Sequence, residues 1–232
     1  MTDTTAAAPA PDSTSPRPAE AGAPTAPSRR GPHPVLVQLG QLYPALFGAT
    51  VQPLKRGIFQ DLLTAHGEVL DKAQLKVAMA IHTRSTRYLQ AVASGAARHD
   101  LQGQAVEPMA PEHVLHAVLE VFKRRKPRPG ETVEQQQQRL QRRIAQIFSD
   151  SGLTREALLE RANIKEPTAL ATLTAALDYA AEQDARAEAV QRAFAASGAA
   201  SPAAFAQMYG MHPKAVERQL ARAAQLQALR SA

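Results

Sequence analysis

Apolar side chains recur every three or four residues through most of the chain after residue 34, and this spacing predicts helices. In the first run Val35, Leu39 and Leu46 share one face, and Pro44 is expected to shorten or bend that helix near its end. Aromatic residues make up only 4% of the 232 residues, and Trp is absent. The core must then be mainly Leu, Ala, Val and Ile, which suits helices better than a β-sandwich. We therefore expect a mainly α fold.

The next two helices are predicted from proline and capping signals. Pro53 suits a helix start, and the helix that follows is expected to run to about His66. Asp71 begins a pattern that resembles a capping box and so predicts the start of the next helix. The exposed face of this helix carries Lys72 and Lys76, one turn apart.

A further helix is predicted over residues 83–92, with Thr83 or Ser85 as its cap. Helix starts leave backbone N–H groups unpaired and carry the positive end of the helix dipole, so they bind phosphate readily. Arg84 and Arg87 lie beside this start. The sequence therefore predicts an anion site here.

Residues 97–106 resemble a short β-hairpin around a glycine turn, with Arg98 on its first strand. Pro111 opens another helix, which ends in the basic run 123–126. Basic residues are favourable at a helix C-terminus, and this run is also a candidate phosphate contact.

Basic residues are concentrated in the middle of the chain. Residues 35–130 carry twelve Lys/Arg against seven Asp/Glu, whereas residues 131–232 carry twelve against eleven. Of the formal net charge of +6, +5 falls in the first of these segments. A polyanion such as nucleic acid is the expected partner of that segment.

Residues 1–33 are rich in Pro, Ala, Ser and Thr, and their apolar content is too small to offset the entropy of ordering, so we expect a disordered tail. The sequence contains no Cys, which excludes disulfides and thiolate nucleophiles and fits a reducing compartment. Because the sequence shows no pattern of a signal peptide, a transit peptide or a membrane span, we expect a cytoplasmic protein without a membrane partner.

The segment after Gly130 is rich in Ala and contains a twofold repeat. A helix leads into Ser151-Gly152, and a short helix, a proline and a third helix follow; the same order recurs around Ser197-Gly198. A gapless alignment at one constant offset relates the copies and pairs Leu159 with Phe205. Since neither copy alone is expected to bury a full core, we predict one all-α domain made of both.

The words PLKRGIFQDL, LDKAQLKVAM, TRSTRYL and GAARHDLQG occur in this order. In this order and spacing they resemble the FinO/ProQ family of bacterial RNA-binding proteins and RNA chaperones, over about residues 34–126. The resemblance implies a small, mainly helical domain with short β-hairpins that binds structured RNA, typically the base of a terminator hairpin with its single-stranded 3′ end. It also implies that the helix start at Thr83, Arg84 and Ser85 holds the terminal phosphates, and that these residues occupy RNA-binding positions: Lys55, Lys72, Lys76, Arg87, Tyr88 and Arg98.

Four positions depart from the frequent family pattern. Gln52 stands where the family often has Arg, and His82 stands where Tyr is common. Arg84 and Thr86 replace a Ser and a Trp. The added charge of Arg84 is expected to offset the loss of charge at Gln52.

The predicted organisation is therefore a tail (1–33), the RNA-binding domain (34–126), a linker (127–132) and a helical accessory domain (133–230), with repeats at about 133–180 and 184–230.

Tyr88 suits either the core or a contact with an RNA base or ribose. Asp61 is expected to form a salt bridge with Lys55 or Arg87.

No enzyme is expected, because the sequence lacks a GxSxG motif, a P-loop and a dinucleotide fingerprint. His113 and His116 lie three residues apart, but no Cys and no third ligand lies nearby in the sequence, so we expect no metal and no cofactor.

The resemblance, together with the basic middle segment, implies an RNA chaperone that binds a terminator-like hairpin, stabilises small RNAs or mRNA 3′ ends and promotes RNA–RNA pairing. Two alternatives stay open: a DNA-binding regulator whose C-terminal repeats act as helix-turn-helix units, and a protein-interaction scaffold. Because the repeats are almost neutral, we expect them to contact a partner protein or the RNA-binding domain rather than a DNA groove.

Overall fold

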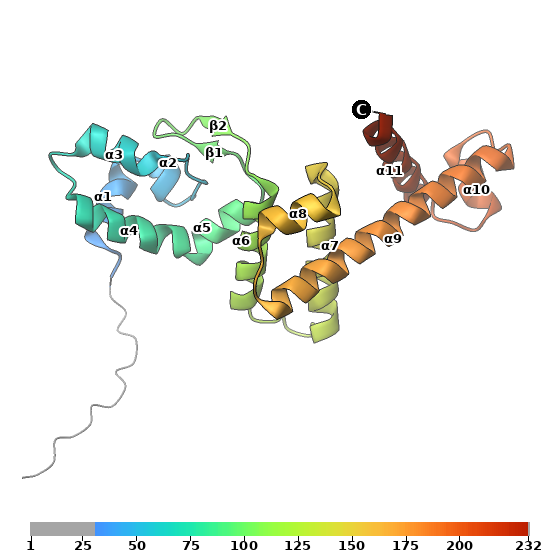
Figure 1. Cartoon of the computed structure of the whole chain (residues 1–232), viewed down its shortest axis with the longest axis horizontal. Helices are drawn as coiled ribbons and strands as arrows, with labels where there is room; N and C mark the ends of the chain where they lie inside the picture. The colour runs from blue at the N-terminus through green and yellow to red at the C-terminus, as the bar shows by residue number, and fades with distance from the viewer. Residues whose placement is uncertain (1–30, 232) are drawn as a thin grey trace, which may run out of the picture. The chain divides into compact units, whose positions relative to one another are not determined.

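The computed structural model describes residues 31–231, so that nearly all of the predicted disordered tail lies outside the described residues. These residues form eleven helices and one two-stranded antiparallel sheet, which confirms the mainly α fold with a short β-hairpin (Figure 1). The helices are α1 (Pro34–Leu42), α2 (Pro44–Phe47), α3 (Ile58–His66), α4 (Lys72–Arg84), α5 (Thr86–Ala93), α6 (Pro111–Arg124), α7 (Val133–Ser151), α8 (Arg155–Ala162), α9 (Pro167–Ser197), α10 (Pro202–Met208) and α11 (Pro213–Ser231), and the strands are β1 (Arg98–His99) and β2 (Ala105–Glu107). None of the described helices combines the length and the apolarity needed to cross a bilayer.

Proline ends the first helix as predicted. Pro44 occupies the first turn of α2, and α1 ends two residues earlier at Leu42. A proline lacks the N–H that would continue α1.

The expected helix start at Pro53 is wrong, because α3 begins only at Ile58. The backbone around Leu54 instead forms a parallel bridge to His99 of β1: the His99 N–H donates to the Pro53 carbonyl at 2.7 Å, and the Lys55 N–H donates to the His99 carbonyl at 2.8 Å. These hydrogen bonds hold the segment extended, and Gly57, with φ +84°, then turns the chain into α3.

The boundary between α4 and α5 also differs from the prediction at one residue. Asp71 caps α4 by accepting a hydrogen bond from the Gln74 N–H at 2.8 Å, as expected. Thr83, however, lies in the last turn of α4, where its hydroxyl donates to the Met79 carbonyl at 2.9 Å. Ser85 alone is the cap of α5.

The hairpin forms where the sequence predicts it. Its strands pair Arg98 with Glu107 and His99 with Ala105, with a bulge between the two pairs. Gly103 takes φ +75° in the turn, a conformation that suits glycine.

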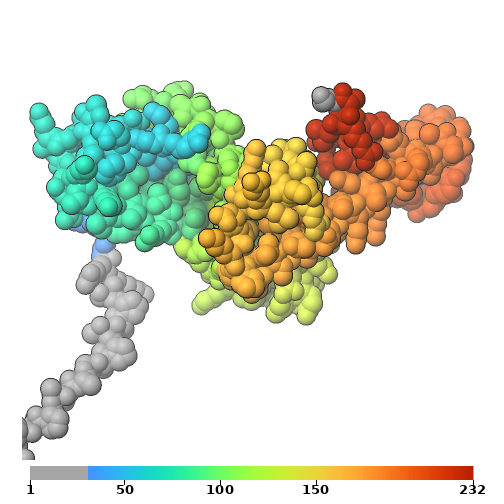
Figure 2. Space-filling model, in the orientation of Figure 1, coloured from blue at the N-terminus to red at the C-terminus, as the bar shows by residue number. Residues whose placement is uncertain are grey.

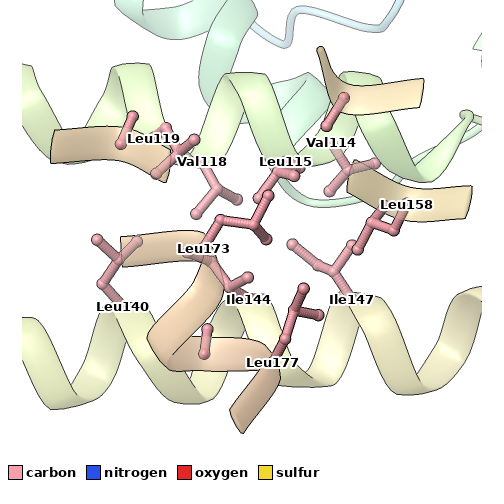
Figure 3. Close-up of a cluster of buried hydrophobic side chains, with 13 residues drawn as sticks. Val114, Leu115, Val118, Leu119, Leu140, Ile144, Ile147, Leu158, Leu173 and Leu177 are labelled. Atoms are coloured by element: carbon pink, nitrogen blue, oxygen red, sulfur yellow. The ribbon is translucent and has the colours of Figure 1, made fainter. Parts of the chain in front are cut away.

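Two clusters of buried apolar side chains meet at α6. The N-terminal cluster joins α1–α5 with one residue of α6, and its members are Leu39, Leu46, Leu54, Ile58, Leu62, Leu70, Leu75, Met79, Tyr88, Val92 and Ala117. The middle cluster joins four residues of α6 to α7, α8 and the first half of α9, and its largest members are Val114, Leu115, Val118, Leu119, Leu140, Ile144, Ile147, Leu158, Leu173 and Leu177 (Figure 3). Figure 2 shows the yellow segment around α8 in direct contact with the green segment that includes α6. The predicted division at residues 127–132 stays a prediction.

The C-terminal cluster is separate and small. It consists of Phe205, Ala206 and Val216, with Phe194 of α9 packed against it. The helix predicted over 169–177 and the helix that leads into Ser197-Gly198 are one continuous helix, α9, which carries residues of both clusters (Figure 1). The two copies of the repeat thus contribute to different clusters.

The structure corrects the register of the repeat. Gly152 and Gly198 end the first helix of each copy with φ +64° and +65°, as the constant offset requires. After the glycines the offset increases by one, because Thr154 caps α8 whereas Ser201, rather than Ala200, caps α10.

The burial pattern follows this shifted register. Within the short helices, the buried residue Leu158 corresponds to the buried residue Phe205. The predicted pairing of Leu159 with Phe205 is therefore wrong by one position.

Candidate nucleic-acid interface

The start of α5 is the best-defined anion site among the described residues. Ser85 has extended backbone angles, and its Oγ accepts a hydrogen bond from the Tyr88 N–H at 3.2 Å. The first backbone hydrogen bond of the helix runs from the Leu89 N–H to the Ser85 carbonyl at 3.0 Å. The amides of Thr86 and Arg87 precede that bond, so they point outward at the positive end of the helix dipole.

Three arginines surround this helix start. Arg84 is exposed at the end of α4, directly before the cap. Arg87 is exposed in the first turn of α5, and its Nη2 donates to the Ala49 carbonyl at 2.5 Å. Arg124, at the end of α6, donates from Nη1 to the Arg84 carbonyl at 2.6 Å. Arg124 is also paired with Glu120 at 2.7 Å, so it contributes less net charge than an unpaired arginine. The outward amides and the neighbouring arginines form a site suited to phosphate oxygens.

The contact of Arg124 with this site was missed by sequence reasoning. The basic run 123–126 was recognised as a candidate phosphate contact, but its position was open. Arg124 reaches a carbonyl 40 residues earlier in the chain, and no local pattern predicts this contact. The signal that was available is the basic end of a predicted helix.

Lys72 and Lys76 form a second basic element on the exposed face of α4. Together with Phe59, Asp71 and Ala73 they line an open hollow with a volume of about 650 Å³. Both lysines are exposed and lie one turn apart, as predicted. A row of phosphates can therefore meet both ammonium groups.

Lys55 is held by a carboxylate of the next helix. Its Nζ lies 2.9 Å from Asp61 Oδ2, which confirms one of the two salt bridges expected for Asp61. The hydrogen bond and the negative charge of Asp61 raise the pKa of Lys55, with burial opposing them more weakly. Because the side chain of Lys55 is 39% exposed, it remains accessible to a ligand.

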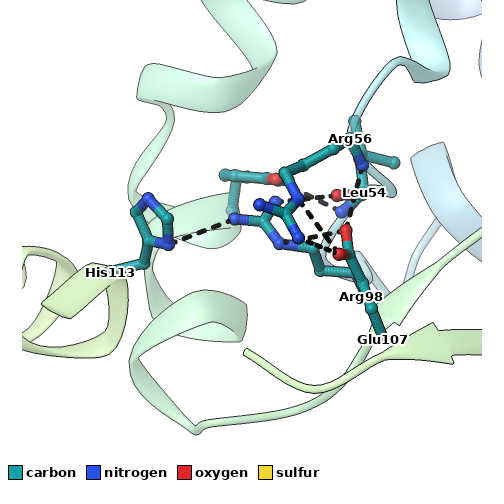
Figure 4. A network of polar contacts seen from close by, with 6 residues as sticks. Leu54, Arg56, Arg98, Glu107 and His113 are labelled. Atoms are coloured by element: carbon teal, nitrogen blue, oxygen red, sulfur yellow. Dashed lines mark hydrogen bonds and ion pairs between the residues drawn. The ribbon is translucent and has the colours of Figure 1, made fainter. Parts of the chain in front are cut away.

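Arg98 is the centre of a structural network rather than an exposed charge. Its Nη1 donates to the Leu54 carbonyl at 2.9 Å, its Nη2 lies 3.4 Å from His113 Nδ1, and its Nε lies 3.6 Å from Glu107 Oε1 (Figure 4). Arg56 also binds Glu107, at 2.7 Å. The side chain of Arg98 is only 15% exposed, so most of its hydrogen-bonding capacity serves the fold.

Tyr88 and His82 pack together inside the N-terminal cluster. Tyr88 is 8% exposed, and its hydroxyl accepts a hydrogen bond from the Leu54 N–H at 3.2 Å. The ring of His82 lies 5.2 Å from the Tyr88 ring and 4.7 Å from the Phe47 ring. Burial, with a smaller effect of the Arg87 charge, lowers the pKa of His82 to about 4. The Tyr88 ring has no face open to stack on a base.

The two histidines of α6 have partners on different elements. His113 contacts Arg98, whereas His116 Nε2 lies 2.7 Å from the Ala162 carbonyl oxygen. Within residues 31–231, no group of three or more His, Asp or Glu is placed to hold a metal ion.

The region that carries the basic helical surface is similar to known proteins. Residues 30–139 match the model of the ProQ/FINO family. The RNA chaperone ProQ of Shewanella frigidimarina is 40% identical over 89 residues, which are 37% of this chain and 44% of that protein. The RNA chaperone ProQ of Shewanella oneidensis is 41% identical over 87 residues, which are 36% of this chain and 41% of that protein.

The match covers less than half the length of these curated relatives. It includes α4, α5 and the hairpin, the elements that the sequence words had indicated. The predicted resemblance is confirmed for this region: residues 30–139, just under half of the chain, match the ProQ/FINO family.

Proposed function

We propose that this protein is an RNA chaperone that captures a terminator-like hairpin together with its single-stranded 3′ end. Capture shields small RNAs or mRNA 3′ ends from exonucleases and promotes pairing with a second RNA. The observation that carries the proposal is the start of α5, where outward amides lie beside Arg84, Arg87 and Arg124. The names of the similar proteins, RNA chaperone ProQ, support RNA as the ligand.

The roles of the residues follow from their positions. The start of α5, with Arg84, Arg87 and Arg124, takes the terminal phosphates, and Lys72 and Lys76 neutralise phosphates of the stem. Lys55 adds a contact beside Asp61. Thr83, Tyr88 and Arg98 act through the fold: the Thr83 hydroxyl bonds to the backbone of its own helix, whereas Tyr88 and Arg98 bond to the backbone of Leu54.

The direct test compares two forms of one RNA. The full chain is titrated with a hairpin that has a U-rich 3′ tail ending either in a hydroxyl or in a phosphate. The hydroxyl form is expected to bind more tightly, because an added phosphate enlarges the terminal nucleotide that the helix start must hold. Equal affinities would exclude capture of the 3′ end.

Arginine variants assign the contact. Arg84→Ala and Arg124→Ala are each expected to weaken binding several-fold and to flatten the dependence of log K on log salt by about one unit. The control is Arg161→Ala on α8, an exposed arginine outside the site. A loss with the control as large as with Arg84→Ala would show that only the net charge matters.

The DNA-binding alternative has less support. Two of the arginines of α11, Arg222 and Arg230, form ion pairs with Asp184 and Glu188 of α9. These pairs reduce the charge that α11 presents to a phosphate backbone.

A further inference from the structure

A groove runs between α5 and α7 across the surface of α6. Its volume is about 410 Å³. Gln90 and Ala93 of α5 form one wall, and Arg139 and Arg143 of α7 form the other. Val121 and Phe122 of α6 lie between them, with Arg125 directly after that helix. The groove therefore has an apolar floor and a polar rim.

Three arginines make this rim positive. Arg143 donates from Nη2 to the Ala93 carbonyl at 2.8 Å, which holds its guanidinium at the groove without neutralising it. Arg139 is paired with Glu131 at 2.6 Å and contributes less net charge. Within residues 31–231, neither Arg125 nor Arg143 has a salt bridge to a carboxylate. The groove thus offers two cationic side chains beside apolar carbon, which is the chemistry of a nucleotide: an anionic phosphate and a flat base.

The groove continues from the site at the start of α5. Arg125 directly follows Arg124, which bonds to the Arg84 carbonyl beside the cap. Gln90 and Ala93 lie on the same short helix that begins at that cap. A strand held at the helix start is therefore next to one end of the groove, and this continuity favours RNA over an acidic peptide as the occupant.

We propose that this groove binds one nucleotide of the single-stranded segment on the 5′ side of the hairpin stem, with its base on Val121 and Phe122 and its phosphate between Arg125 and Arg143. The inference rests on the proposed function, in which the 3′ end already occupies the start of α5. The 5′ flank is then the single strand that remains. The groove makes the chain prefer a hairpin with a 5′ extension.

The test uses the full chain and two RNAs with the same stem and 3′ tail, one without a 5′ extension and one with a single-stranded extension of about six nucleotides. The unmodified chain is expected to bind the extended RNA more tightly. Arg125→Ala and Arg143→Ala should each reduce that affinity about fivefold and lower the salt slope by roughly 0.7, while leaving the unextended RNA unaffected. Arg125→Ala is not expected to disturb the fold, since no side-chain hydrogen bond of Arg125 to another of the described residues is found. It therefore keeps the test valid if Arg143→Ala fails to fold.

Arg142→Ala is the matched control. Arg142 is the neighbour of Arg143 on α7, but it is exposed and does not line the groove. Its replacement should leave both affinities unchanged. A 4-thiouridine in the extension should also crosslink to the segment that contains Val121 and Phe122.

The remaining outcomes separate a failure of the proposed function from a failure of the groove proposal. If the unmodified chain binds neither RNA, the proposed function and the groove proposal both fall. If it binds the unextended RNA but gains nothing from the extension, or if Arg142→Ala lowers the affinity as much as Arg143→Ala, the groove proposal alone is overturned. Binding of a poly-glutamate peptide that is lost in Arg143→Ala, with RNA binding retained, would assign the groove to an acidic protein instead.

Discussion

His82 lies in an aromatic pocket that excludes its charged form. The side chain is 7% exposed, beside the Phe47 and Tyr88 rings, and burial lowers its pKa from 6.5 to about 4. The protonated ring would have to enter this apolar site, and the nearby Arg87 would repel it. The residue therefore couples folding to pH.

The first prediction is a loss of stability in mild acid. Between pH 6.5 and pH 4 the unfolded chain binds a proton at His82 and the folded chain does not. The contribution of neutral His82 to the free energy of unfolding is therefore fully present above pH 6.5 and is lost as the pH is lowered through this window. The loss is on the order of 3 kcal/mol. His82→Phe should remove this part of the pH dependence in urea unfolding. If the chain and the variant lose stability in parallel between these pH values, the assignment to His82 is wrong.

The second prediction separates a structural arginine from an exposed one. Arg98→Ala should lower the free energy of unfolding by about 1–3 kcal/mol, because it removes the donor to the Leu54 carbonyl and leaves buried polar atoms unpaired. Arg56 binds the same Glu107, but its side chain is 77% exposed, so Arg56→Ala should lower the free energy of unfolding much less than Arg98→Ala does. Urea unfolding measures both. An equal cost for the two variants would contradict the structural role of Arg98.

These residues show how far sequence reasoning reached at this scale. Lys72 and Lys76 could be placed on an exposed face, because helical periodicity fixes which side chains point outward. Arg98 could be placed on a strand, but its burial depends on Leu54, Glu107 and His113, none of which is a neighbour in the sequence. Local patterns carry no information on such long-range contacts.

At the scale of elements, the twofold repeat shows a compensated change in length. One residue separates Gly152 from the cap Thr154, whereas two residues separate Gly198 from the cap Ser201. The short helix of the second copy, α10, has seven residues against eight in α8, so that the prolines that open the third helices return to the original offset. A gapless alignment fits both ends and misplaces the short helix between them. The repeat could be predicted from the sequence, but its register could not.

The third prediction tests this register. Ser201→Ala should destabilise the C-terminal cluster by about 1 kcal/mol, because the Ser201 side chain accepts a hydrogen bond from the Ala204 N–H at 3.1 Å. Ala200→Ser places a hydroxyl at the position that the constant offset assigns to the cap, and it should leave stability unchanged. Thermal unfolding of the full chain provides the comparison. A larger effect at residue 200 than at residue 201 would restore the constant offset.

At the scale of the whole molecule, α6 links the proposed RNA-binding region to the first copy of the repeat. Ala117 belongs to the N-terminal cluster, whereas Val114, Leu115, Val118 and Leu119 belong to the middle cluster. The basic end of the same helix supplies Arg124 to the start of α5. Packing of α7–α9 on α6 thus supports the helix that completes the proposed RNA site.

The last prediction follows from this arrangement. A fragment of residues 31–130 lacks the cover of α6, and each of its four uncovered Val or Leu side chains loses up to roughly 1.5–3 kcal/mol of burial. We expect it to melt at a lower temperature than a fragment of residues 31–182, which keeps α7, α8 and the first half of α9, and to bind more of the dye ANS. It should also bind the 3′-hydroxyl hairpin more weakly, because a loosened α6 no longer fixes Arg124 at the start of α5. Equal melting temperatures and equal affinities for the two fragments would mean that the region before residue 130 is complete without the repeat.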